Sequence, residues 1–155
     1  MSAANLTRRV TRYLCDTSAL IAAVSSWHEH HERTRSEIER RQRSDEHLVV
    51  AGHSLAETYS VLTRLPAPHR LRAEDAIALI EGNWRDTPIV HLTGSEMWDA
   101  LRETQRRGLI GGQMYDALIA IAALKAKAAT IVTWNVRNFA AFAPSIAVVA
   151  PRRSA

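Results

Sequence analysis

Short apolar runs alternate along this chain with longer segments of helical periodicity. Runs of this kind that end at polar residues are typical of buried strands. The predicted strands are Tyr13–Cys15, His47–Ala51, Pro88–Leu92, Thr130–Thr133 and Ile146–Val149. The predicted helices are Ala19–Val24, Trp27–Arg43, Ser54–Arg64, Arg72–Trp84, Thr93–Arg107 and Gln113–Lys127. This alternation predicts an α/β fold with a mostly parallel sheet of about four to five strands.

Polar side chains follow two of these strands at their carboxyl ends, where parallel sheets bind ligands. Asp16 and Thr17 follow the first strand, and Thr133 and Asn135 lie at the end of the fourth. Asp is also a common helix N-cap and Asn a common turn residue, so both have structural explanations. A second polar cluster at the same edge of the sheet nevertheless favours a functional site.

Two further acidic residues lie in predicted helices. Glu57 follows Ser54 at the spacing of a capping box, which would make it a structural residue. Asp116 lies in the first turn of its helix, where the helix dipole stabilises a negative charge. That helix is apolar nearly all round, so we expect Asp116 to face a cleft or to be paired.

The composition is that of a globular protein. The chain has 155 residues, of which 46% are hydrophobic and 23% charged, so we expect one domain over residues 1–155 with a loose extension over residues 1–11. The single cysteine, Cys15, excludes an intrachain disulfide and a cysteine-based zinc site, and its predicted burial argues against a nucleophilic thiol. Neither a targeting segment nor a membrane-spanning run is recognisable, and we expect a cytoplasmic protein.

The charge balance is mildly basic. The net charge is +4 and the sequence pI about 9.8, and nearly all of the positive charge comes from arginine. Arginine binds phosphates through its forked guanidinium, so a polyanionic partner is favoured by chemistry, although an ordinary surface of mixed charge has the same balance.

Other chemistries find less support. The segment Trp27–His31 places His28 and His31 one helical turn apart, but it offers no third well-placed ligand, so a polar helix face is favoured over a metal site. The sequence contains no GxSxG, GxGxxG, Walker A or HExxH motif, which leaves serine-hydrolase, dinucleotide-binding and kinase-type functions unsupported.

Four segments carry the polar residues described above, and together they resemble one family. They are Leu14–Leu20, Leu55–Leu62, Tyr115–Ala120 and Thr133–Phe139. In this order they are similar to the opening strand, the second and third acidic segments and the closing motif of PIN-domain nucleases. The short chain is similar to the VapC toxins of bacterial type II toxin–antitoxin pairs.

The resemblance implies a three-layer α/β/α PIN-like domain and an endoribonuclease that depends on Mg²⁺ or Mn²⁺. The catalytic residues carried over are Asp16, Glu57, Asp116 and Asn135, with the three acids as metal ligands and Thr17 and Thr133 as water-orienting residues. The candidates for RNA binding are Arg64, Arg106, Arg107 and Arg137. The implied partners are a cognate antitoxin, the RNA substrate and a second copy of the chain in a homodimer.

One position departs from the family pattern. The closing motif usually carries Asp where this chain has Asn135, which brings no charge. We therefore expect one tightly bound metal ion, with a second recruited together with the RNA phosphate.

Two alternatives remain open at this stage. A phosphoryl-transfer α/β enzyme would use Asp16 as a covalent nucleophile, although Ser18 stands where the hydrolase version needs a second acid. A PIN-like fold without chemistry would act as an RNA- or protein-binding module, and Asn135 favours this alternative.

Overall fold

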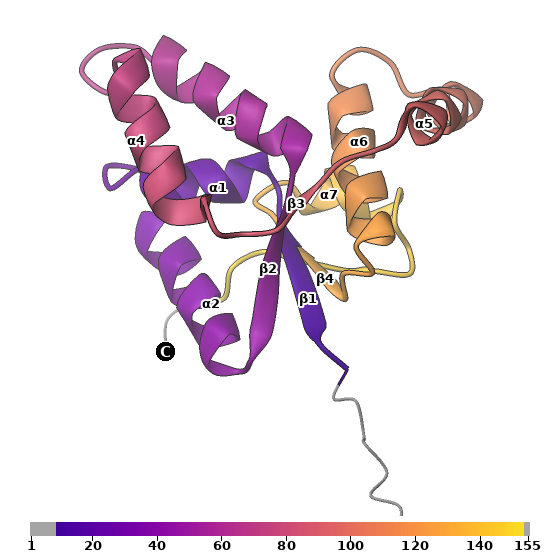
Figure 1. Ribbon diagram of the computed structural model, residues 1–155, viewed down its shortest axis with the longest axis horizontal. Helices are drawn as coiled ribbons and strands as arrows, with labels where there is room; N and C mark the ends of the chain where they lie inside the picture. The colour runs from indigo at the N-terminus through magenta and orange to yellow at the C-terminus, as the bar shows by residue number, and fades with distance from the viewer. Residues whose placement is uncertain (1–8, 154–155) are drawn as a thin grey trace, which may run out of the picture.

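The computed structural model describes residues 9–153 and contains a parallel sheet of five strands in the order β3-β2-β1-β4-β5 (Figure 1). The strands are β1 (Thr11–Cys15), β2 (Glu46–Ala51), β3 (Ile89–Val90), β4 (Thr130–Val132) and β5 (Ala147–Val149). Every neighbouring pair runs in parallel. The carboxyl ends of all five strands therefore point to the same edge of the sheet, and β1 lies at its centre.

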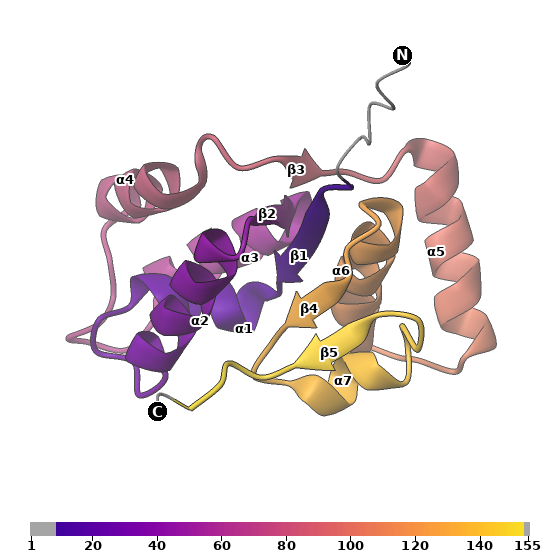
Figure 2. The ribbon, with the colours of Figure 1, turned by 90° about the horizontal axis from the view of Figure 1, so that it is seen from below.

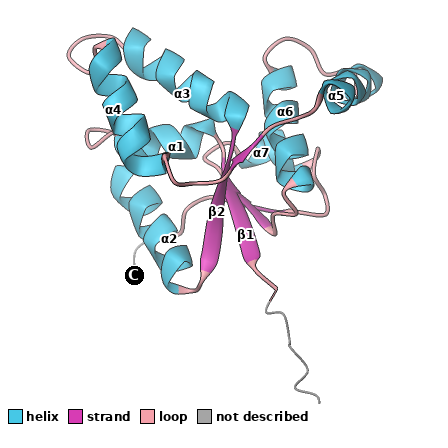
Figure 3. Cartoon of the chain, in the orientation of Figure 1, coloured by secondary structure: helices cyan, strands magenta, loops and turns pink. Residues whose placement is uncertain are grey.

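Helices cover both faces of the sheet (Figures 1 and 3). They are α1 (Thr17–Val24), α2 (His31–Arg43), α3 (Gly52–Arg64), α4 (Ala73–Trp84), α5 (Gly94–Arg106), α6 (Gln113–Lys125) and α7 (Val136–Ala140). Helices α1 to α4 lie on one side of the sheet, and α6 and α7 lie on the other, with α5 outermost against α6 (Figures 1 and 2). The predicted three-layer α/β/α arrangement is confirmed.

Alternation along β1 divides the core into two halves. Tyr13 and Cys15 pack in the cluster that includes Leu20 of α1, whereas Leu14 between them packs in the cluster that includes Ile119 of α6. Successive side chains of a strand point to opposite faces. A strand buried on both faces reads as a continuous apolar run, which is why β1 was recognisable in the sequence.

Several element boundaries differ from the predicted ones. Helix α2 begins at His31 rather than Trp27, because the rings of the preceding residues stack on two other loops. The short helix α7 was not predicted. Thr11, predicted in the loose extension, is the first residue of β1, and the prediction for residues 1–8 lies outside the described residues. Within residues 9–153, no helix combines the length and apolar character that crossing a bilayer requires.

Two segments have the spacing of a capping box, and one of them forms it. Thr93 and Glu96 make the reciprocal pair of hydrogen bonds at the start of α5. The box at Ser54 and Glu57 is wrong, because α3 already begins at Gly52 and Ser54 lies buried inside the helix. Glu57 is therefore not a capping residue, and its carboxylate is available for another role.

Candidate active site

Asp16 occupies the carboxyl end of the central strand and is the most buried of the acidic candidates. Only 3% of the surface of Asp16 is exposed to solvent. Its Oδ1 accepts hydrogen bonds from Ser18 Oγ at 2.7 Å and from the Ala19 amide at 3.0 Å, and its Oδ2 accepts one from Thr133 Oγ1 at 2.7 Å. Asp16 is thus both the N-cap of α1 and the centre of a polar cluster that joins β1 to β4.

Burial makes the charge on Asp16 costly. The pKa of Asp16 is raised to about 6: desolvation is the largest cause and the negative charge of Asp116 adds to it, whereas the three hydrogen bonds lower it. A buried carboxylate that has a raised pKa and lies near a second carboxylate tends to bind a proton or a cation.

Asp116 lies in the first turn of α6 and is half-buried. Its Oδ2 accepts a hydrogen bond from the amide nitrogen of Asn138 at 3.1 Å. Desolvation raises the pKa of Asp116, and the charge of Glu57 raises it further. Asn138 was missed in the sequence, because it lies in α7, which was not predicted.

Glu57 lies in α3 beside an imidazole. A carboxylate oxygen of Glu57 is 3.1 Å from His53 Nε2, one turn earlier in the same helix. The His53 ring stacks on Tyr115, with centroids 4.8 Å apart and planes 14° apart. Tyr115 precedes Asp116, so this stack brings the start of α3 to the start of α6.

The three predicted acids act on one another through their charges. Asp116 raises the pKa of Asp16, and Glu57 raises that of Asp116. Within the described part of the chain, no three His, Cys, Asp or Glu side chains lie close enough together to form a complete metal site. Mg²⁺ suits such an arrangement, because it usually binds one or two carboxylates and keeps several waters. The donor set therefore fits a hard divalent ion held partly through water.

The remaining polar predictions fall in different places. Thr133 is buried and binds Asp16, and it also accepts a hydrogen bond from the Asn135 amide at 2.9 Å. Thr17 is buried as well, but its hydroxyl has no hydrogen-bond partner among residues 9–153, and the residue that binds Asp16 is its neighbour Ser18. The side chain of Asn135 is exposed, so its participation stays a prediction.

The four arginines predicted to bind RNA differ in whether their side chains are already engaged in ion pairs. Arg106 and Arg107, at the end of α5, both pair with Glu103, at 2.5 and 2.7 Å, and Arg107 also lies over the Phe142 ring. Arg64 ends α3 and Arg137 lies in α7, and both are exposed. Arg64 and Arg137 are therefore more open to solvent contacts, and the binding of phosphates by any of the four arginines stays a prediction.

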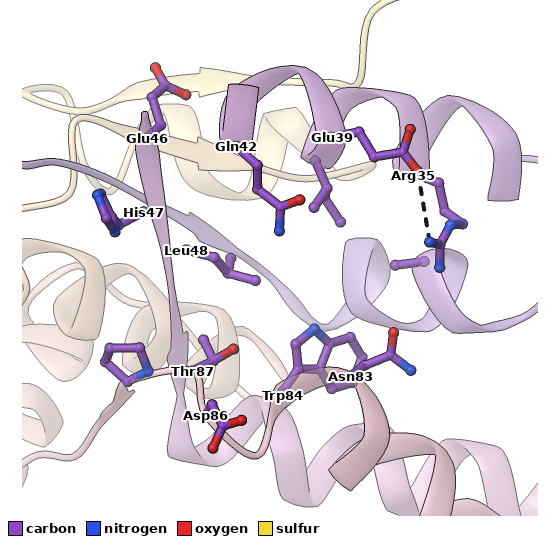
Figure 4. Close-up of a pocket in the computed structure, with 13 residues that line it drawn as sticks. Arg35, Glu39, Gln42, Glu46, His47, Leu48, Asn83, Trp84, Asp86 and Thr87 are labelled. Atoms are coloured by element: carbon purple, nitrogen blue, oxygen red, sulfur yellow. Dashed lines mark ion pairs between the residues drawn. The ribbon is translucent and has the colours of Figure 1, made fainter. Parts of the chain in front are cut away.

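A separate pocket of about 350 Å³ lies between α2, β2 and the segment that follows α4 (Figure 4). Leu48 and Trp84 form part of its apolar wall, and an Arg35–Glu39 ion pair lies at its rim. None of the predicted acids lines it. The pocket faces the amino end of β2, away from the carboxyl ends of the strands where the acidic residues lie.

Comparison with known proteins agrees with this geometry. Residues 13–143 match the PIN domain. The chain is 34% identical over 122 residues to ribonuclease VapC40 of Mycobacterium tuberculosis, covering 79% of this chain and 85% of the relative. It is 36% identical over 116 residues to ribonuclease VapC27 of the same organism, covering 74% and 72%.

Solved structures share the fold. One is VapBC2 from Rickettsia felis bound to a DNA fragment from their promoter, with a TM-score of 0.66 and 18% identity, covering 90% of this chain and 98% of that chain. Another is Mycobacterium tuberculosis VapC20, a sarcin–ricin loop cleaving toxin, with a TM-score of 0.60 and 20% identity, covering 77% and 86%. The chain belongs to the PIN-domain family and, within it, to the VapC ribonucleases, as its four motifs predicted.

Proposed function

We propose that the protein is the toxin of a toxin–antitoxin pair, an endoribonuclease that cleaves RNA with a divalent metal ion, Mg²⁺ or Mn²⁺. The observation that carries the proposal is the clustering of negative charge at the carboxyl edge of the sheet, where the charge of Asp116 raises the pKa of Asp16 and the charge of Glu57 raises the pKa of Asp116. Carboxylates that repel one another in this way are stabilised by a divalent cation. The proposed reaction, cleavage of RNA, is that of the VapC ribonucleases to which the chain is similar.

The chain's own residues hold this site in position. Asp16, Asp116 and Glu57 would hold the metal, directly or through water. Thr133 and Ser18 fix the carboxylate of Asp16 by donating hydrogen bonds to opposite oxygens. A bound Mg²⁺ or Mn²⁺ would supply a Lewis acid that lowers the pKa of an attacking water and offsets charge on the phosphodiester. No protein nucleophile is then required.

RNA, an antitoxin and a second copy of the chain are the proposed partners. Arg64 and Arg137 would contact RNA phosphates, with Arg106 and Arg107 released from Glu103 as further candidates. The solved relative VapBC2 from Rickettsia felis supports an antitoxin partner through its fold. We place the protein in the cytoplasm, where its RNA substrates are.

The test is cleavage of total RNA by the purified chain without antitoxin. We expect cleavage in Mg²⁺ or Mn²⁺, none in chelator, and none with Asp16→Asn, which keeps a good helix N-cap but removes the charge. Asp99→Asn is the matched control, because Asp99 is 78% exposed on α5, and it should cleave as the wild type does.

Two outcomes would contradict the proposal. Cleavage that persists in chelator would remove the metal from the mechanism. An inactive wild type whose melting temperature does not respond to divalent metal would favour a binding module that has lost its chemistry.

A further inference from the structure

Five aromatic and imidazole rings form a continuous series across three loops beside the acidic site. Trp134 stacks on His30, with centroids 3.7 Å apart and planes 11° apart. His30 neighbours His28, and His28 neighbours Trp27, each with centroids 5.6 Å apart. Trp27 stacks on His69 at 4.1 Å and 18°. We call these five residues the aromatic strip.

One end of the strip is joined to the acidic site. The Trp134 amide donates a hydrogen bond to Ser18 Oγ at 3.0 Å, and that hydroxyl donates to Asp16 at 2.7 Å. The indole N–H of Trp134 donates to Thr34 Oγ1 at 3.0 Å, which fixes the plane of the ring. A group held at the Trp134 end of the strip would therefore lie beside a phosphodiester bound at the acids, and the strip leads from there to Trp27.

Towards its other end, at Trp27 and His69, the strip is partly open to solvent. Trp27 is 44% exposed, and His28, His30 and His69 are half-buried. Burial lowers the pKa of His28, which favours the uncharged imidazole. The Trp27 ring stacks on His69 and still has part of its apolar surface open to solvent.

Positive charge accompanies the rings. The Arg33 guanidinium lies 4.9 Å from the Trp134 ring centroid and donates to the Pro151 carbonyl at 2.7 Å. Arg70, next to His69 in the chain, is exposed and donates to the Leu65 carbonyl at 2.8 Å. Grooves that bind single-stranded nucleic acids combine aromatic rings with cations in this way.

We propose that the aromatic strip binds unpaired bases of the RNA substrate by stacking, with Trp27 as the exposed platform. This inference rests on the nuclease function proposed above and names the form of RNA that the site takes. Every base has a π face, so the strip selects unpaired nucleotides rather than a particular sequence. An RNA loop with splayed bases fits it, and a continuous duplex does not.

The test measures binding instead of cleavage, so that it is independent of the catalytic proposal. A labelled single-stranded RNA oligonucleotide is titrated into Asp16→Asn protein, followed by a series of oligonucleotides that each lack one base. The same titrations are made with Trp27→Ala, Trp27→Phe and Trp98→Ala added to Asp16→Asn. Trp98 is the matched control, because it is 62% exposed on α5, across the molecule from α2 (Figures 1 and 2).

We expect Trp27→Ala to weaken binding by about 5- to 150-fold, as loss of one base stack does. Trp27→Phe should weaken binding less, and Trp98→Ala should leave it unchanged. With the parent protein, one or two abasic positions should weaken binding. With Trp27→Ala, those positions should lose their effect, because the stacking partner is already gone.

Two results would overturn the inference. One is equal affinity for RNA of the Trp27→Ala and Trp98→Ala proteins. The other is a weaker Trp27→Ala protein that keeps the full abasic profile, which would mean a structural effect. A protein that binds RNA through Trp27 but never cleaves it in Mg²⁺ would instead overturn the nuclease proposal and leave the strip assigned.

Discussion

At the scale of single residues, the side-chain amide of Asn138 donates a hydrogen bond to one of the three acids, and within residues 9–153 the side-chain amide of Asn135 donates to none of them. Asn138 donates to Asp116 at 3.1 Å, and this hydrogen bond lowers the raised pKa of that carboxyl. We expect Asn138→Ala to reduce RNA cleavage by about 10- to 100-fold, as losing a partner of a metal-binding residue does. The loss of cleavage rate should be larger at limiting than at saturating metal, because the variant binds the metal ion more weakly.

Asn135→Ala is the matched comparison, because it removes the same side-chain type three residues away. The Asn135 side chain is exposed, and only its backbone amide contacts the polar cluster. We expect it to retain most of the activity. If Asn135→Ala were the more damaging change, the closing motif would act through Asn135, as the family resemblance implies.

The candidate acids were predictable because their neighbours are distinctive. Asp16 follows a continuous apolar run, and Asp116 opens a helix that is apolar nearly all round. His53 and Asn138 could not be found in this way, because the stack of His53 on Tyr115 and the hydrogen bond of Asn138 to Asp116 cross between elements. Ser18 could be found only as a neighbour of Asp16.

At the scale of elements, helix α2 is held by charges rather than by an apolar stripe. Its buried residues are Thr34, Glu37 and Arg41. Arg41 donates to Glu37 at 3.0 Å and to Glu46 of β2 at 2.8 Å, and Glu37 also accepts from the Arg152 amide at 3.2 Å. Hydrophobic periodicity does not report burial of this kind, because the buried residues of α2 are polar or charged.

This network gives a prediction for stability. Arg41→Ala leaves the carboxylate of Glu37, whose side chain is 1% exposed, without its buried partner. Breaking a buried ion pair costs about 3–5 kcal/mol, and we expect a loss of about 3 kcal/mol, since Arg40 still binds Glu37. Urea unfolding of the wild type and of Arg41→Ala measures this loss in the free energy of unfolding.

Arg40→Ala is the control for that measurement. Arg40 binds the same Glu37 oxygen, but its side chain is 35% exposed. Exposed ion pairs contribute up to about 1 kcal/mol. Equal losses for the two variants would mean that burial of Arg41 does not govern the strength of the network.

At the scale of the whole molecule, the acidic site opposes the stability of the fold. The parallel topology gathers the carboxyl ends of β1 and β4 at one edge, which buries Asp16 beside Thr133. The same burial raises the pKa of Asp16 from 3.8 to about 6. The folded protein therefore binds a proton that the unfolded chain has already released between these values of pH.

The sign of the pH dependence follows from that difference. The contribution of Asp16 to the free energy of unfolding is fully present below pH 3.8 and is lost as the pH rises through about 6. A shift of this size corresponds to roughly 3 kcal/mol. Asp16→Asn lacks this titration and keeps the N-cap. In chelator, the free energy of unfolding of Asp16→Asn minus that of the wild type should therefore rise by roughly 2–3 kcal/mol as the pH is raised from 4 to 7.

Urea unfolding of both proteins across this range measures the difference, in which the titrations of the other acids largely cancel. Added Mg²⁺ should narrow the gap at pH 7, because a cation at the acids stabilises only the wild type's charged carboxylate. Parallel stability curves would mean that Asp16 titrates alike in the folded and unfolded chains. The burial of its charge would then not be what draws a cation to the site.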